Sequence, residues 1–116
     1  MDERDFLEML GGLSDYLKEE KTFIQNPSRI ADVQRAYELA KELFPEAEEI
    51  SVIDDPLQTG ALTISIRDYE MFVRGSRDIA LFNELIKNAD NFEFIPYGEG
   101  EVKFSLLFTD ALIRIG

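Results

Sequence analysis

The sequence contains no histidine and no cysteine among its 116 residues. Nucleophilic triads and the usual zinc sites draw on these two residue types, so most forms of both are excluded. Without cysteine the chain forms no disulfide, which agrees with a reducing cytoplasm. Carboxylates, hydroxyls, lysine and arginine remain as the candidates for chemistry. We therefore favour a protein that is not an enzyme, and no motif indicates a cofactor.

Basic residues are scarce: the chain has 12 Lys and Arg against 24 Asp and Glu, which gives a formal net charge of −12 at pH 7. Residues 1–20 hold seven acids and two bases, and residues 46–58 hold five acids and no base. A field of this sign repels nucleic-acid phosphates and anionic lipids, and it attracts basic proteins. We expect a protein partner with a basic surface, and neither nucleic acid nor a membrane. The alternative is that these carboxylates only keep the protein soluble.

Long apolar stretches are also absent. No segment approaches the ~18–20 residues that span a bilayer, and the first residues lack the basic and then apolar pattern of a signal peptide. We therefore expect a cytoplasmic protein. A length of 116 residues and an apolar share of 45% are typical of one globular domain, so residues 1–116 are predicted to form a single domain.

Three segments show the spacing of apolar residues that is typical of an amphipathic helix. The first is acidic and covers about residues 2–23. The second begins at Asn26-Pro27, where asparagine caps and proline tolerates the first turn, and it ends before Pro45. The third runs to about Ala89, with Ser76 as its expected cap.

Between and after these helices the apolar residues alternate, which is typical of strands. Residues 50–54 and 62–67 predict one hairpin, and residues 69–74 predict either a third strand or an extension of the second. Phe92 and Phe94 are expected to pair with residues 102–108 across a glycine-rich turn, which would give the core an aromatic face.

These elements predict an α+β fold with the order ααββ(β)αββ. It contains a single antiparallel sheet of four to five strands, two N-terminal helices, and one helix between the hairpins. The sheet face away from the helices is expected to mix polar and apolar side chains, so it is either solvated or an interface with a partner or second copy.

The first candidate site is an acidic patch for a protein partner. It comprises Glu46, Glu48, Glu49, Asp54 and Asp55. Carboxylates that end a strand also have the chemistry to hold Mg²⁺ or Ca²⁺, which makes the two aspartates an alternative cation site. Their spacing does not match a calcium-binding loop, and Asp-Pro is a common way to open a turn.

A second set of residues carries a weaker signal. Asp90, Glu101 and Lys103 resemble the Asp and Glu-x-Lys constellation of restriction-type nucleases, in which carboxylates hold Mg²⁺ beside a lysine. The net negative charge opposes an approach to DNA. An exposed polar pair on one strand is the simpler interpretation.

The third candidate is a small-anion site formed by Arg74, Ser76 and Arg77 just before a helix. It lacks the glycine spacing and the lysine of a phosphate-binding loop. The alternatives are an ordinary helix cap, or arginines that meet the acidic patch of a second copy.

The leading hypothesis is a non-enzymatic protein-interaction module, such as an adaptor, inhibitor or chaperone-like protein, that forms a homodimer. A carboxylate-dependent metal-binding enzyme and a small-anion binding domain are the alternatives.

Overall fold

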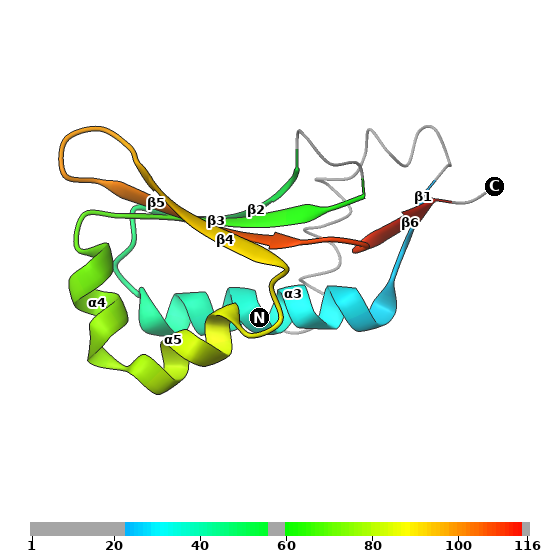
Figure 1. Ribbon diagram of the computed structural model, residues 1–116, viewed down its shortest axis with the longest axis horizontal. Helices are drawn as coiled ribbons and strands as arrows, with labels where there is room; N and C mark the ends of the chain where they lie inside the picture. The colour runs from blue at the N-terminus through cyan, green and yellow to red at the C-terminus, as the bar shows by residue number, and fades with distance from the viewer. Residues whose placement is uncertain (1–22, 56–59, 115–116) are drawn as a thin grey trace.

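A computed structural model of the chain describes residues 23–55 and 60–114 (Figure 1). The predicted helix over about residues 2–23, with the first acidic segment, lies outside these residues apart from its last position. The described elements are β1 (Phe23–Gln25), α3 (Pro27–Leu43), β2 (Glu49–Asp54), β3 (Leu62–Asp68), α4 (Met71–Arg77), α5 (Ile79–Ile86), β4 (Asn91–Pro96), β5 (Val102–Phe108) and β6 (Leu112–Arg114).

Four strands form one antiparallel sheet in the order β2-β3-β5-β4, and the short strands β1 and β6 pair with each other. The helices α3, α4 and α5 all lie on one side of the four-stranded sheet (Figure 1). The predicted α+β class and element order are therefore confirmed for the described part of the chain. Pro96 is the last residue of the edge strand β4, as expected for a residue that has no N–H to donate.

The helix α3 follows the predicted pattern. Pro27 occupies its first turn, and the helix ends at Leu43, two residues before Pro45. Its buried side is the apolar stripe that the spacing predicted, and it includes Val33 and Ala40, which are fully buried. This stripe packs on the sheet. A helix of this length is only marginally stable by itself, and within a protein it gains most of its stability from burying its apolar face.

The segment after β3 corrects two predictions. Residues 71–77 form the helix α4, so a third strand over residues 69–74 is wrong. The cap of the next helix is Asp78, whose carboxylate accepts a hydrogen bond from the Leu81 N–H at 2.9 Å. Ser76 lies inside α4, where its hydroxyl donates to the Val73 carbonyl at 2.9 Å, so it is not a cap.

The sheet register assigns each strand residue to one of two faces. The rung Ile50, Ile66, Phe104 and Phe94 crosses all four strands on the face toward the helices. The next rung places Ser51, Ser65, Ser105 and Glu93 on the opposite face. We call this opposite side the outer face, and its mixture of polar and apolar side chains is the one predicted.

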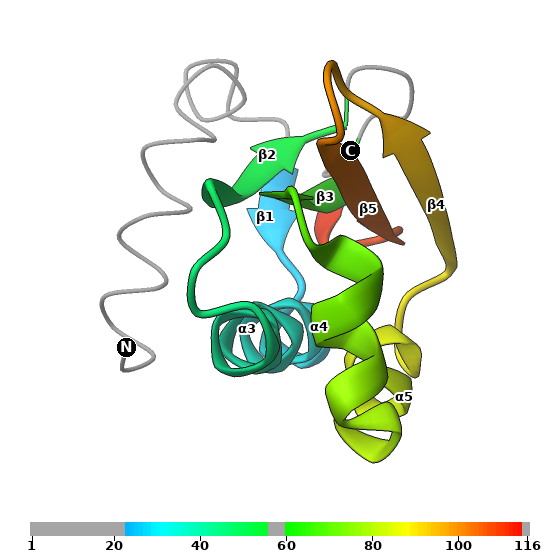
Figure 2. The same ribbon diagram turned by 90° about the vertical axis from the view of Figure 1, so that its left-hand side faces the viewer.

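The aromatic core face is only partly as expected. Phe104 and Phe108 on β5 are fully buried, but Phe92 is 46% exposed and Phe94 is 36% exposed. The reason is position: β4 is the edge strand and lies at the margin of the sheet, with α4 and α5 below it (Figure 2).

Candidate functional site

The predicted acidic patch is divided between the two ends of β2. Glu46, Glu48 and Glu49 lie where the chain enters the strand, and Asp54 and Asp55 lie where it leaves. A six-residue strand separates these ends by about 17 Å, so the five carboxylates do not form one cluster.

Glu46 and Glu49 form ion pairs with arginines of the described part of the chain. An oxygen of Glu46 lies 3.2 Å from the Arg74 guanidinium, and an oxygen of Glu49 lies 3.2 Å from that of Arg67. Each ion pair neutralises part of the negative charge that the patch would present to a partner. Binding of a partner at this patch stays a prediction.

Asp54 and Asp55 differ in their surroundings. Successive residues of a strand point to opposite faces, and Asp54 belongs to the helix-facing rung with Leu62. The Oδ1 atom of Asp54 is buried without a hydrogen-bond partner, and burial raises the pKa of this carboxyl. Asp55 instead accepts a hydrogen bond from the Thr63 hydroxyl at 3.1 Å.

These orientations do not bring the two aspartates together around one ion. Among residues 23–55 and 60–114, no group of three or more acidic side chains is arranged to hold a metal. Cation binding by the pair stays an untested prediction.

The predicted anion site contains an arginine that is already surrounded by carboxylates. Arg74 lies within 3.2 Å of Asp68 and of Glu46, and within 3.4 Å of Glu70. Its side chain is only 11% exposed. Arg77 is exposed at the end of α4, so the two arginines present no joint site at a helix start.

A second ionic cluster lies on the outer face at the turn between β4 and β5. Arg67 pairs with Glu101 at 2.7 Å, and its guanidinium stacks over the Tyr97 ring at 4.6 Å. The charge of Glu101 and its hydrogen bond with Tyr69 raise the pKa of that phenol. Glu101 is 7% exposed, and its ion pair with Arg67 joins the turn end of the β4–β5 hairpin to β3.

The nuclease-like residues are not assembled. Asp90 precedes β4, where it accepts hydrogen bonds from the Thr109 N–H and hydroxyl and pairs with Arg29. Glu101 lies at the opposite end of the same hairpin, and the intervening ladder runs from the Asn91 rung to the Pro96 rung. Five residues of strand correspond to about 17 Å, which is too far for two carboxylates to share one ion.

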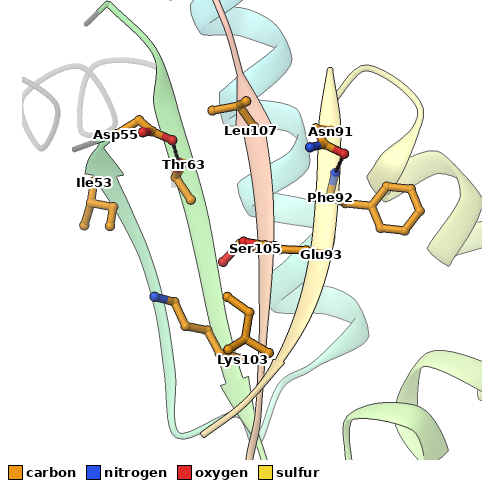
Figure 3. Close-up of a pocket in the computed structure, with 10 residues that line it drawn as sticks. Ile53, Asp55, Thr63, Asn91, Phe92, Glu93, Lys103, Ser105 and Leu107 are labelled. Carbon is orange, nitrogen blue, oxygen red and sulfur yellow. Dashed lines mark hydrogen bonds between the residues drawn. The ribbon is translucent and has the colours of Figure 1, made fainter. Parts of the chain in front are cut away.

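The outer face contains a shallow hollow of about 520 Å³. Ser105 and Leu107 form its floor with Thr63, and Glu93 lines its β4 side. Figure 3 shows the Lys103 side chain extending from β5 across β3, away from β4. Among the described residues, the Lys103 ammonium has no salt-bridge partner. The hollow is open, and its shape does not indicate a particular ligand.

The most distinctive surface is one that the sequence patterns missed. Phe72 on α4 and Phe94 on β4 have ring centroids 5.2 Å apart, and Phe92 lies 6.3 Å from Phe94. These three residues, which we call the aromatic ridge, are 62%, 36% and 46% exposed in the order Phe72, Phe94, Phe92. The ring of Phe94 stacks on the buried Phe104 at 4.5 Å, so the core holds the ridge in place.

The sequence contains a signal for this ridge, but the alternating pattern alone predicts that Phe92 and Phe94 belong to the core. The alternation of Phe92 and Phe94 correctly predicts one face of a strand, but alternation does not reveal how far the helices cover that face. The strand predicted over residues 69–74 includes Phe72, and that prediction gives Phe72 no neighbour on β4.

A comparison with protein-family models, with curated proteins and with solved structures found no match to this chain. Within the described ranges, no helix is both long and apolar enough to cross a membrane.

Proposed function

We propose that this chain is a non-enzymatic protein-interaction module and that its contact surface is the aromatic ridge. The observation that carries the proposal is the contact between Phe72 and Phe94, which joins a helix and an edge strand into one exposed apolar surface. Scattered apolar residues are normal on a protein surface, but contiguous ones commonly mark binding sites.

Aromatic side chains suit this role because they bury a large area with few rotatable bonds, and they are enriched at the centres of interfaces. The ridge is also preorganised. Phe94 is held by its stack on Phe104, and Phe104 is also stacked with Phe82, at a centroid distance of 5.6 Å. A partner would therefore meet a surface that loses little conformational entropy on binding.

Charged side chains also lie on the elements that carry the ridge. Glu70, which pairs with Arg74, is exposed just before α4, and Arg77 is exposed at the end of that helix. Glu93 projects from the opposite face of the edge strand β4. Charges at a rim steer and select partners more than they add affinity.

The test is site-specific photo-crosslinking in the native host. A photoreactive phenylalanine analogue at position 72 is expected to yield a discrete crosslinked protein. The same analogue at position 113 is the matched control, because Ile113 on β6 is 44% exposed but lies outside the ridge. Equal crosslinking from both positions, or none from position 72, contradicts the proposal.

A second variant separates charge from apolar contact. Phe72→Ser is expected to weaken capture of the crosslinked partner at least about tenfold, since truncation of a hot-spot residue costs about 2 kcal/mol or more of binding free energy, and about 1.4 kcal/mol already corresponds to tenfold. Ile113→Ser is expected to leave capture unchanged. If capture survives in Phe72→Ser but is lost at high salt, the acidic residues and not the ridge form the contact.

A further inference from the structure

Resting on this proposed function, we infer that the ridge accepts a second copy of the same chain, with the two β4 strands pairing antiparallel about a twofold axis at Phe94. The inference depends on the backbone of the edge strand, on the side chains that would face each other, and on the charge of the chain.

The backbone groups of β4 alternate between the sheet and its open edge. The Tyr97 N–H donates to the Glu101 carbonyl at 2.8 Å, which sets the alternation at the turn. Ile95, Glu93 and Asn91 then exchange hydrogen bonds with β5, and the N–H and C=O groups of Phe92 and Phe94 point away from the sheet. Figure 2 shows β4 as the margin of the sheet.

The open edge allows few registers. Pro96 has no N–H, and the Phe92 N–H is already bonded to the Asn91 side chain at 2.9 Å. Among the described residues, Phe94 alone of these three has an outward N–H and C=O that both lack a partner. A proline or a bonded N–H on an edge strand commonly prevents pairing with another strand. In β4 these features lie at Pro96 and Phe92, and the backbone of Phe94 between them is free to pair.

A twofold axis at Phe94 satisfies both groups at once. Phe94 would exchange two N–H···O bonds with the partner's Phe94, and Phe92 would lie opposite the partner's Pro96. At each end the partner's Pro96 has no N–H and the Phe92 N–H keeps its bond to the Asn91 side chain, so the new backbone bonds are those of the central pair. A register shifted by two residues would place a proline or a capped N–H at the central pair, so the pairing is specific.

The side chains are compatible with this register. On the helix side, two copies of Phe94 would form a cross-strand aromatic pair beside the contacts of Phe92 with the partner's Pro96. On the outer face, Glu93 would lie opposite the partner's Ile95, so no like charges are directly opposed. Aromatic cross-strand pairs stabilise a sheet and opposed like charges destabilise it.

The net charge distinguishes a second copy from a basic partner. Each chain carries a formal charge of −12, so two copies repel at long range, and salt screens that repulsion. Self-association is therefore expected to strengthen with salt. Binding of a basic protein would weaken with salt.

The first experiment is sedimentation velocity on the full chain over a wide concentration range at low and at high salt. A dimer whose population rises with both concentration and salt supports the inference. A monomer under all conditions overturns it while leaving the proposed function intact, provided that position 72 still crosslinks to a different protein. Loss of both results removes the ridge as an interface.

The second experiment tests the register. The chain contains no cysteine, so Phe94→Cys introduces a single thiol. Directly opposed residues of a hydrogen-bonded pair lie about 5.5 Å apart between Cα atoms, within the range of a disulfide. Under mild oxidation this variant should form dimers at least about tenfold faster than the control Ile113→Cys, because pairing raises the local thiol concentration. Equal rates overturn the inference.

A measurement on the unmodified chain covers the case in which Phe94→Cys fails to fold. Amide hydrogen exchange at Phe94 should slow as the dimer forms, because its outward N–H becomes bonded. The exchange of Glu93, which bonds within the sheet, is the internal control. A dimer in which the Phe94 amide keeps exchanging freely uses another surface, and it contradicts the β4 pairing.

Discussion

The Nε atom of Arg74 lies 3.2 Å from the Oδ2 atom of Asp68, and both residues are buried. Asp68 ends β3 and Arg74 lies in the middle of α4, so this ion pair joins the sheet to the helix that carries Phe72. Asp68 also accepts a hydrogen bond from the Glu70 N–H at 3.2 Å, at the residue that precedes the helix. One carboxylate thus both organises the start of α4 and binds its arginine.

Asp68→Ala is expected to lower the free energy of unfolding by about 3–5 kcal/mol, because it removes the buried counterion of a buried guanidinium, whereas the other carboxylates near Arg74, Glu46 and Glu70, are exposed. Glu70→Ala is the matched control. Glu70 pairs with the same arginine but is 58% exposed, so its loss should cost less than about 1 kcal/mol. Urea unfolding of the two variants gives both values, and equal losses would contradict a dominant role for Asp68.

Asp90→Asn is expected to lower the free energy of unfolding by about 1–2 kcal/mol at neutral pH, the lower part of the range for charged hydrogen bonds because the carboxylate is 43% exposed. Partial burial raises the pKa of Asp90, but hydrogen bonds from Thr109 and the Arg29 guanidinium outweigh it, and the pKa lies below its ordinary value of 3.8.

The lowered pKa determines the sign of the pH dependence. The stability from Asp90 is fully present above the ordinary carboxyl range, and it is lost as the pH falls through the lowered pKa. The difference between the wild-type chain and Asp90→Asn should therefore shrink in strong acid. Urea unfolding at a series of pH values measures it, and a difference that stays constant into strong acid would refute this assignment.

Asp54→Asn is expected to raise the melting temperature at neutral pH, whereas Asp90→Asn is expected to lower stability. Burial raises the pKa of Asp54, so its folded state favours the protonated carboxyl and loses stability as the pH rises through that pKa. The amide carries no charge and removes this cost. Calorimetry at neutral and acid pH should show the gain at neutral pH only, and a loss at neutral pH would show that the charged carboxylate stabilises the fold.

Glu101→Gln is expected to lower the pKa of Tyr69 toward the ordinary value of 10.0, since the charge of Glu101 and its hydrogen bond are the main causes of the raised pKa. The raised value means that the folded state favours the neutral phenol, and this stability is lost as the pH rises through the folded pKa. An NMR titration, with Tyr69→Phe to assign the signal, follows the shift. An unchanged titration would show that the two side chains do not interact in solution.

Local patterns were sufficient for much of the fold. The apolar spacing and the flanking prolines predicted α3, because a helix of this length depends mainly on one buried stripe and on defined ends. The alternation of Phe92 and Phe94 with residues 102–108 predicted the second hairpin and the residues that share one of its faces, because alternation assigns each residue to one face of a strand.

Tertiary contacts decided the rest. Residues 69–74 alternate like a strand, yet they form the end of a turn and the start of α4, where burial of Met71 and Arg74 and the ion pair with Asp68 outweigh local preference. The candidate sites changed for the same reason. The position of each helix on the sheet determines which carboxylates lie beside Arg74. It also determines whether Phe92 and Phe94 are covered.

The sequence by itself therefore determined the class of the fold, the main helix, the second hairpin and the excess of negative charge. These follow from periodicity and composition, which are local or additive properties. Only the tertiary structure separated the carboxylates that are paired within the molecule from those left to solvent, and only it exposed the aromatic ridge. Both depend on the distances between residues that are remote in the chain, and those distances are set by packing.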